Sequence, residues 1–511
     1  MRRFDDIVVG AGGAGAVLAV RLSEDRGRRV GLIEAGPHYQ DTVTTPADLL
    51  DGNTMSLREH SWGLTARITA DRRIPFPQGK VTGGSSAVGN TVAIRGTPAD
   101  YDEWAALGNP LWSWDQALPV LTALEDDLDF GTREFHASGG PVPIRRWRPD
   151  ELTPAQHAFL EGCLAAGHAY AEDHNHPESS GVGPIPSTRR DASVRVSTAM
   201  GYLWPVRDRP NLEIMPGGLV DRVVVRGGRA CGVVVDGEEI SARRVILAAG
   251  AIGSPAVLWR SGIGPGDRLR HLGIPVQADL PGVGAGLTDQ PRIGVFMTPM
   301  AGTEDEGKAT GQIVLRTTSS SSVAPRFNDM YYAMVNRFDL THHFPKLREV
   351  AGARSVFGVM AVPRRTHSRG SVVLASADPA APPHVDLGYL SDERDYLLLA
   401  EAVRRCWQLT QSPKIVGQGQ DVVLIDQQTL ESEESMRHYI DAAVDSAYNP
   451  VGTARMGKAD DETAVVDQRC AVHGVDGLHV ADASVMPAMV CANTLLSVVM
   501  IAERVASFLA E

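Results

Sequence analysis

The chain has 511 residues, of which 43% are hydrophobic and 22% charged, and its formal net charge is −13. This composition is typical of a globular protein with a large core, and the length predicts two domains. The acidic residues are spread along the chain without any basic block, which argues against a nucleic-acid partner.

The cysteines and the apolar runs indicate the compartment. Five cysteines show no CxxC pair and no metal-binding spacing with histidine, so we expect reduced thiols that mostly fill core space. The first apolar run, Ile7 to Val9, leads directly into a glycine motif, and no signal peptide is expected. No apolar stretch approaches the ~20 residues of a membrane span. We therefore expect a cytoplasmic protein with no membrane partner.

The first residues predict a dinucleotide-binding βαβ unit. A strand ending at Val9 precedes the GAGGAG motif at 10–15, a helix over 16–23, a strand over 29–33 and then Glu34. The glycines permit a tight turn and close approach to a pyrophosphate, whose charge the helix N-terminus stabilises. Glu34 would accept hydrogen bonds from ribose hydroxyls. The predicted dinucleotide-binding residues are Gly10, Gly12, Gly13, Gly15, Glu34 and Ala35, and this motif alone leaves FAD and NAD open.

Two further motifs resemble the signatures of one enzyme family. Residues 79–87 (GKVTGGSSA) resemble the first signature of the glucose–methanol–choline (GMC) oxidoreductases, and residues 250–264 match the second at every constrained position. The segments that also resemble this family, in its usual order, are 101–114, 280–291, 368–374 and 477–487. The resemblance covers essentially the whole chain.

The resemblance implies an α/β fold with FAD as cofactor. It predicts a Rossmann-like FAD-binding domain interwoven with an α+β substrate domain built on an antiparallel sheet. The expected FAD-binding segments are 1–140, 190–292 and 441–511, and the expected substrate-binding segments are 141–189 and 293–440. Val88 stands where some relatives carry a flavin-linking histidine, so the resemblance predicts non-covalent FAD.

The same resemblance implies contacts between FAD and particular residues. The GGSSA stretch lies along the flavin and pyrophosphate in this family, Val220 resembles a residue whose backbone meets the adenine, and Asp482 resembles an acid near the diphosphate. A helix cap is the other interpretation of Asp482. The family's I-N-G reads V-G-N at 88–90 here, which shifts the asparagine by one position. The implied FAD contacts are Gly84, Ser85, Asn90, Val220, Asp482, Ala483 and Thr494.

The catalytic positions depart from the family pattern. Relatives carry a histidine base in an H-P-x-G-T stretch, with a second His or Asn about 40 residues later; this chain has Asn449 and Asn493. An amide cannot take up a proton near neutral pH, and a general base contributes ~10² to 10⁴-fold in rate. Three explanations stay open: another base such as His342 or His343, a substrate that needs no strong base, or a role without oxidation.

We predict an oxidoreductase that transfers a hydride from a small organic substrate, with an alcohol favoured, to flavin N5. Oxygen or another acceptor would then take the electrons. The alternatives are a flavin-containing lyase or decarboxylase without net oxidation, and a non-catalytic flavin-binding protein. No metal is expected, because His174 and His176 lack a third ligand at a suitable spacing and are predicted to lie in a surface loop.

Overall fold

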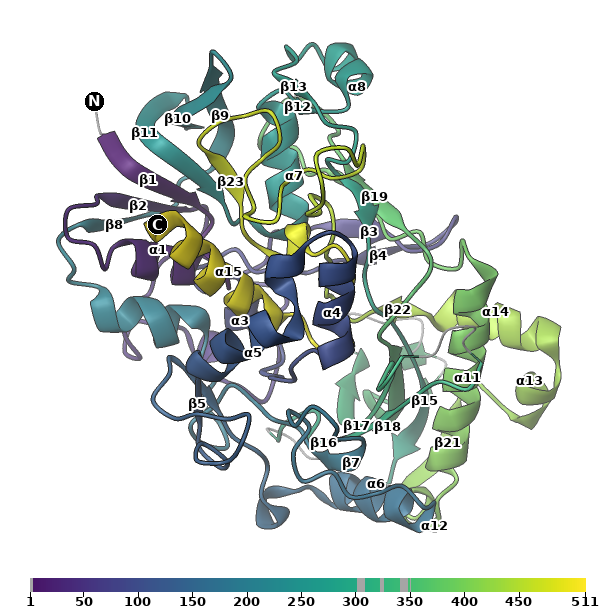
Figure 1. Cartoon of the computed structure of the whole chain (residues 1–511). Coiled ribbons are helices and arrows are strands. Elements are labelled where there is room, and N and C mark those ends of the chain that lie inside the picture. Colours follow the sequence, from purple (N-terminus) through teal and green to yellow (C-terminus); the bar gives the residue numbers. More distant parts are fainter. Residues whose placement is uncertain (1–2, 301–307, 322–325, 341–347, 350) are drawn as a thin grey trace.

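Within the residues that the computed structural model describes, two seven-stranded sheets organise the chain (Figure 1). The described residues are 3–300, 308–321, 326–340, 348–349 and 351–511. Among the helices in these ranges, none combines the length and apolar character needed to cross a membrane. All five cysteines are free thiols, and four of them are buried.

The first sheet combines parallel strands with an antiparallel edge, in the order β8-β2-β1-β11-β10-β9, and β23 also pairs with β11. Its strands are β1 (Arg3–Val9), β2 (Val30–Glu34), β8 (Leu212–Pro216), β9 (Val220–Arg226), β10 (Arg229–Val235), β11 (Glu238–Leu247) and β23 (Leu478–Val480). β1 pairs in parallel with β2, and α1 (Gly15–Leu22) connects them, which confirms the predicted βαβ unit. Every residue of β2 is buried, as is typical of a parallel sheet covered on both faces.

The second sheet is antiparallel throughout, in the order β21-β15-β18-β17-β16-β7, and β22 also pairs with β15. Its strands are β7 (Gly181–Pro184), β15 (Pro291–Pro299), β16 (Ile313–Thr317), β17 (Met330–Asp339), β18 (Ser355–Pro363), β21 (Gly419–Val423) and β22 (Asp445–Ser446). α11 (Glu393–Thr410) packs on β15 and β18, and α6 (Pro154–Ala165) packs on β7, β16 and β17. This is the antiparallel sheet that the resemblance implies.

A five-stranded sheet joins distant parts of the chain in the order β14-β19-β20-β3-β4. Its strands are β3 (Thr65–Arg67), β4 (Arg73–Pro75), β14 (Ala285–Leu287), β19 (Gly370–Val373) and β20 (His384–Asp386). Two further strand pairs are β5 (Glu125–Asp127) with β6 (Val142–Ile144), and β12 (Ile263–Gly264) with β13 (Ala278–Asp279). The family-like segment 368–374 thus contributes β19 to this smaller sheet. The domain boundaries stay a prediction.

The helices cover the sheets and connect their strands (Figure 1). Those not yet mentioned are α2 (Ala47–Leu50), α3 (Ser85–Val88), α4 (Pro98–Ala106), α5 (Trp114–Ala123), α7 (Gly250–Arg260), α8 (Gly266–His271), α12 (Pro413–Val416), α13 (Gln427–Glu431), α14 (Glu433–Ala443) and α15 (Leu495–Ala510). α15 forms the last segment of the chain and packs against α1. The ion pair of Arg21 with Glu503, at 2.7 Å, joins these two helices.

The contact between α1 and the turn before it leaves no room for a side chain at Gly15. A Cβ atom at this position would lie 1.7 Å from the carbonyl oxygen of Gly10, whereas a Cβ at Gly13 would meet no atom closer than 3.5 Å. Overpacking of this kind typically costs about 1–3 kcal/mol. We expect Gly15→Ala to lower the free energy of unfolding of the apoprotein by at least this amount in urea titrations, and Gly13→Ala to leave it nearly unchanged. Equal effects of the two substitutions would contradict this account of the turn.

Candidate active site

The predicted dinucleotide-binding turn is a backbone cradle. A Cβ on Gly84 would lie 2.7 Å from Gly12 Cα, and Gly84 has a φ of 51°, so only glycine suits this position. Among the described residues, no acceptor binds the backbone N–H groups of Gly12, Gly13 and Ala14. Free N–H groups at a helix N-terminus attract phosphate. The free N–H groups of this turn therefore suit a bound pyrophosphate.

Glu34 holds this turn from the end of β2. Its two carboxylate oxygens accept hydrogen bonds from the N–H groups of Ala11 and Gly36, each at 2.8 Å. Burial raises the pKa of the Glu34 carboxyl. Each oxygen keeps a second lone pair, so a ribose hydroxyl remains a possible donor to Glu34. Ala35 lies half-buried beside it.

Asp482 acts as a helix cap in the structure. Its Oδ2 accepts from Gly250 N (2.8 Å) and Ser254 Oγ (2.5 Å), and its Oδ1 accepts from Ser484 N (2.8 Å) and Ser484 Oγ (2.6 Å). These bonds join the N-terminus of α7 to the turn at 483–485, which contains Ala483. The capping interpretation of Asp482 is thus observed, while its contact with a diphosphate stays a prediction.

The other predicted FAD contacts occupy different settings. Ser85 begins α3 and is exposed, as is Asn90. Val220 is buried at the start of β9, and its carbonyl accepts a hydrogen bond from Arg260 Nη2 at 3.3 Å. Thr494 precedes α15, and its hydroxyl donates to Asn449 Oδ1 at 3.4 Å. Their contacts with FAD stay predictions.

The turn at 490–493, which carries Asn493, is held by side chains from several elements. The bonds are Gln290 Nε2 to the carbonyls of Val490 (3.2 Å) and Ala492 (3.0 Å), Arg316 Nη2 to that of Cys491 (3.3 Å), and the Cys491 N–H to Asp100 (2.9 Å). Since every one of these bonds is made to the backbone, the turn is fixed independently of its side chains. Asn493 is thereby presented at the start of α15.

The two predicted catalytic amides belong to one polar cluster, which we call the amide–arginine cluster: Asn449, Gln290, Arg364 and Asn493. Asn449 Nδ2 donates to Gln290 Oε1 at 2.9 Å, and Arg364 Nη1 donates to the same oxygen at 2.7 Å. Arg364 Nη2 donates to Asn493 Oδ1 at 3.2 Å. The structure therefore brings Asn449 and Asn493 together, but through an arginine that the sequence analysis does not predict.

Arg364 lies directly after β18 and is only 2% exposed. Its guanidinium carbon lies 4.2 Å from the ring centroid of Tyr331 in β17. In the sequence, the pair Arg364-Arg365 follows a buried apolar strand. This position indicates that one of the two arginine side chains points inward. The sequence alone does not say toward what.

Asp289 positions Asn449 through its backbone N–H and not through its amide side chain. Its carboxylate accepts hydrogen bonds from the N–H of Asn449 (2.7 Å), the hydroxyl of Tyr389 (2.7 Å) and the hydroxyl of Ser446. Among the described residues, no histidine hydrogen-bonds to any member of the amide–arginine cluster. His342 and His343, considered as substitute bases, lie outside the described residues.

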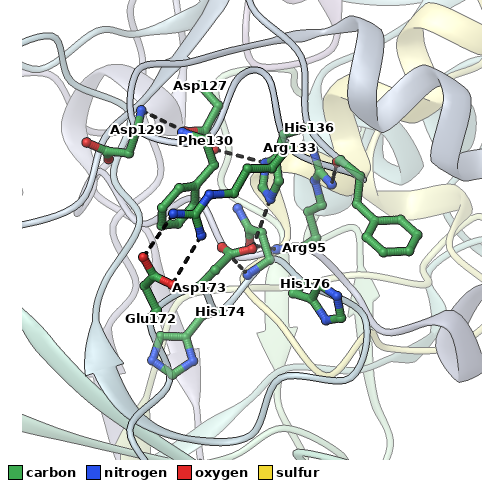
Figure 2. A network of polar contacts seen from close by, with 12 residues as sticks. Arg95, Asp127, Asp129, Phe130, Arg133, His136, Glu172, Asp173, His174 and His176 are labelled. Carbon is green, nitrogen blue, oxygen red and sulfur yellow. Dashed lines mark hydrogen bonds and ion pairs between the residues drawn. The ribbon is translucent and has the colours of Figure 1, made fainter.

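A second polar cluster surrounds His136 (Figure 2). Its ring nitrogens contact the carboxylates of Glu125 (3.1 Å), Asp127 (3.0 Å) and Asp173 (2.9 Å). Glu125, Asp127 and His136 are close enough together to hold a metal ion. Two guanidiniums already bind these carboxylates: Arg95 pairs with Glu125, and Arg146 pairs with Asp127 (2.8 Å) and Asp173 (2.6 Å).

With His136 protonated, this cluster contains three cations and three anions. Burial by itself disfavours the charged ring, but hydrogen bonds to Asp127, Asp173 and Glu125 raise the pKa of His136 to about 10. The same contacts outweigh burial for Asp127 and lower its pKa to about 2. Because the charges balance among the side chains themselves, we assign the cluster a structural role.

His174 corrects one expectation from the sequence. It is 1% exposed rather than on a surface loop, and burial lowers the pKa of its imidazole to about 3. His176 is exposed, and its ring packs edge-on against Phe135 at 5.1 Å. The loop turns inward at His174 because the neighbouring Asp173 binds Arg146.

Comparison with known proteins identifies the family of the chain. Profiles of the N- and C-terminal parts of the GMC oxidoreductases match residues 4–292 and 366–502. The chain is 36% identical to 5-(hydroxymethyl)furfural oxidase of Methylovorus sp. strain MP688, over 98% of each chain. It is 33% identical to an oxygen-dependent choline dehydrogenase of Burkholderia pseudomallei strain 1710b, over 99% of this chain and 93% of the relative. The solved structure of pyridoxine 4-oxidase from Mesorbium loti superposes with a TM-score of 0.89 at 30% identity, over 99% of each chain.

The raised pKa of His136 predicts pH-dependent stability. Its protonated form contributes stability that is fully present below its ordinary pKa of 6.5 and is lost as the pH rises through about 10. We expect His136→Gln to lower the free energy of unfolding by about 3–5 kcal/mol near pH 6, as when one partner of a buried ion pair is removed. The difference should shrink toward pH 10 in urea titrations, and His176→Gln should have little effect. A penalty independent of pH would contradict the assignment.

Proposed function

Because the chain belongs to the GMC oxidoreductases, a family of FAD-dependent enzymes, we propose that it oxidises an alcohol by hydride transfer. FAD, when bound, supplies the two-electron acceptor at N5. Oxygen or a second acceptor then takes the electrons. Non-covalent attachment of FAD is part of the proposal, because Val88 offers no atom that could bond to the flavin. Five free thiols support a reducing compartment, and we propose the cytoplasm.

One observation carries this proposal: the two amides adjoin the cofactor turn. α15 begins directly after Asn493 and Thr494, and its first residue, Leu495, packs beside Gly13. A Cβ at Gly13 would lie 3.6 Å from Leu495 Cδ1. The amide–arginine cluster therefore lies next to the turn that fits the pyrophosphate of FAD.

The cluster residues orient the substrate rather than accept its proton. The amide groups of Asn449 and Asn493 each offer a donor and an acceptor, which suits a hydroxyl group. When the hydroxyl is held in place, the hydrogen on the carbinol carbon is directed toward flavin N5. Such positioning contributes a large part of the rate enhancement of many enzymes. The hydroxyl proton must leave to solvent or to a group other than these two amides.

The test is the visible spectrum of the purified holoenzyme under anaerobic conditions, titrated with alcohols, amines and thiols. We expect alcohols to bleach the oxidised-flavin band while the alcohol becomes a carbonyl compound. Bleaching only by amines or only by thiols would show that the substrate is an amine or a thiol and not an alcohol. A product formed without bleaching would favour a lyase, and an intact band without any product would favour a binding protein.

The missing base gives a sharper prediction. We expect Asn449→His to raise the rate of flavin reduction by alcohols by about tenfold or more, because a general base contributes ~10² to 10⁴-fold. Asn449→Gln keeps an amide without adding a base and should give no increase. Rapid-reaction absorbance measures both variants. If Asn449→His is no faster than the parent with any alcohol, the site is not simply one that has lost its base.

A further inference from the structure

We propose that Arg364 and Arg316 form a site for a substrate carboxylate, so that the alcohol oxidised by this enzyme is a hydroxy acid. This inference rests on the proposed function and adds the class of substrate. It follows from the positive charges around the amide–arginine cluster, which no carboxylate among the described residues pairs with.

Both arginines are buried without a counterion. Arg364 is 2% exposed and Arg316 is 3% exposed. Arg364 donates to the side-chain oxygens of Gln290 and Asn493, and Arg316 donates to the carbonyls of His174 (2.8 Å) and Cys491 (3.3 Å). All four acceptors are neutral. Across the described ranges, no Asp or Glu carboxylate lies within 4 Å of either guanidinium.

Two other buried arginines of the described chain differ from this pair, since one has a carboxylate partner and the other makes more hydrogen bonds. Arg365, the next residue, pairs with Glu103 at 2.5 Å. Arg195 has no carboxylate partner among the described residues, but it donates to four backbone carbonyls. Arg364 has five N–H groups, and its hydrogen bonds to the described residues account for only two of them. It keeps donors available for a further acceptor.

The two guanidiniums also act on each other. Burial lowers the pKa of Arg364 to about 10, and the nearby charge of Arg316 adds to this effect. Both groups still carry their charge at neutral pH. Burying like charges without a counterion is costly, and an anion bound beside them would offset that cost. A neutral alcohol bound at the same place would not offset this cost.

A carboxylate matches this site better than any neutral group. Its two oxygens accept parallel hydrogen bonds from one guanidinium, which gives both strength and orientation. Arg364 contacts Asn493 directly, so the anion would lie beside the amides that orient the hydroxyl. In the oxidation the carbinol carbon loses a hydride to FAD and the hydroxyl loses a proton, giving an oxo acid. The carboxylate itself is unchanged.

The first experiment measures binding without turnover. Benzoate, which carries no hydroxyl to oxidise, is titrated into the holoenzyme, and the flavin spectrum and the melting temperature are followed, with benzamide as the neutral match. We expect benzoate to bind and benzamide not to, and Arg364→Met to weaken benzoate binding at least tenfold. Arg365→Lys, which keeps a cation next to Glu103, is the control and should bind benzoate as the parent does. Equal binding of benzoate to the parent and Arg364→Met would overturn the proposal.

The second experiment measures flavin reduction by 4-(hydroxymethyl)benzoate and 4-(hydroxymethyl)benzamide. We expect kcat/KM to favour the acid at least tenfold, and Arg364→Met to abolish this preference by lowering kcat/KM for the acid much more than for the amide. Equal rates for the acid and the amide would overturn the proposal. Equal losses of kcat for both in Arg364→Met would do the same, because they would place the arginine at the reacting oxygen.

Stability provides an independent check. Removal of an uncompensated buried charge should leave the melting temperature of Arg364→Met unchanged or higher, whereas a structural ion pair would lose stability. Arg364→Lys keeps the charge but lacks the planar fork, and it should show an intermediate affinity for benzoate. If no alcohol bleaches the flavin, the proposed function fails, and benzoate binding still decides whether the arginines form an anion site.

Discussion

At the glycine turn, the backbone of Gly15 packs directly on that of Gly10, and the backbone of Gly84 packs on that of Gly12. The arrangement of the site depends on these two contacts. A Cβ at Gly15 or at Gly84 would collide with the main chain of Gly10 or Gly12. With hydrogen in that place, α1 lies against the end of β1, and the segment around Gly84 lies against the turn. α15 then packs beside α1, and Asn493 lies just before its first residue. The close backbone packing at these glycines thus places the predicted cofactor-binding turn beside Asn493.

The chain compensates buried charge in two different ways. Around His136, three carboxylates meet three cations, and the cluster is complete without any ligand (Figure 2). Around Arg364 the partners are neutral oxygens, although the burial is just as deep. A buried charge without a counterion is destabilising on its own. The cluster around His136 therefore has a structural role. The cluster around Arg364 belongs to the proposed active site, where a bound anion would compensate its charge.

Part of the site was predictable and part was not, for reasons that individual residues make clear. Asn449 and Asn493 stand in recognisable stretches, so the sequence indicated both positions. The sequence offers two interpretations of Asp482, and only the tertiary structure shows that its four hydrogen bonds cap α7 and the turn at 483–485. His174 looked like a surface residue because its neighbours are polar. It is buried because the adjacent Asp173 reaches inward to Arg146.

The sequence by itself determined the βαβ unit, the family and the loss of the imidazole, because each depends on local spacing: glycines in a turn, apolar residues in a strand, an asparagine before a proline. Tertiary structure alone decided which charges are compensated. Arg364 and Arg365 are neighbours in the chain, yet Arg365 pairs with Glu103 while Arg364 donates to the neutral side chains of Gln290 and Asn493. That difference depends on contacts between residues more than 70 positions apart in the chain. Electrostatic energy depends on distance in space, which no local pattern records.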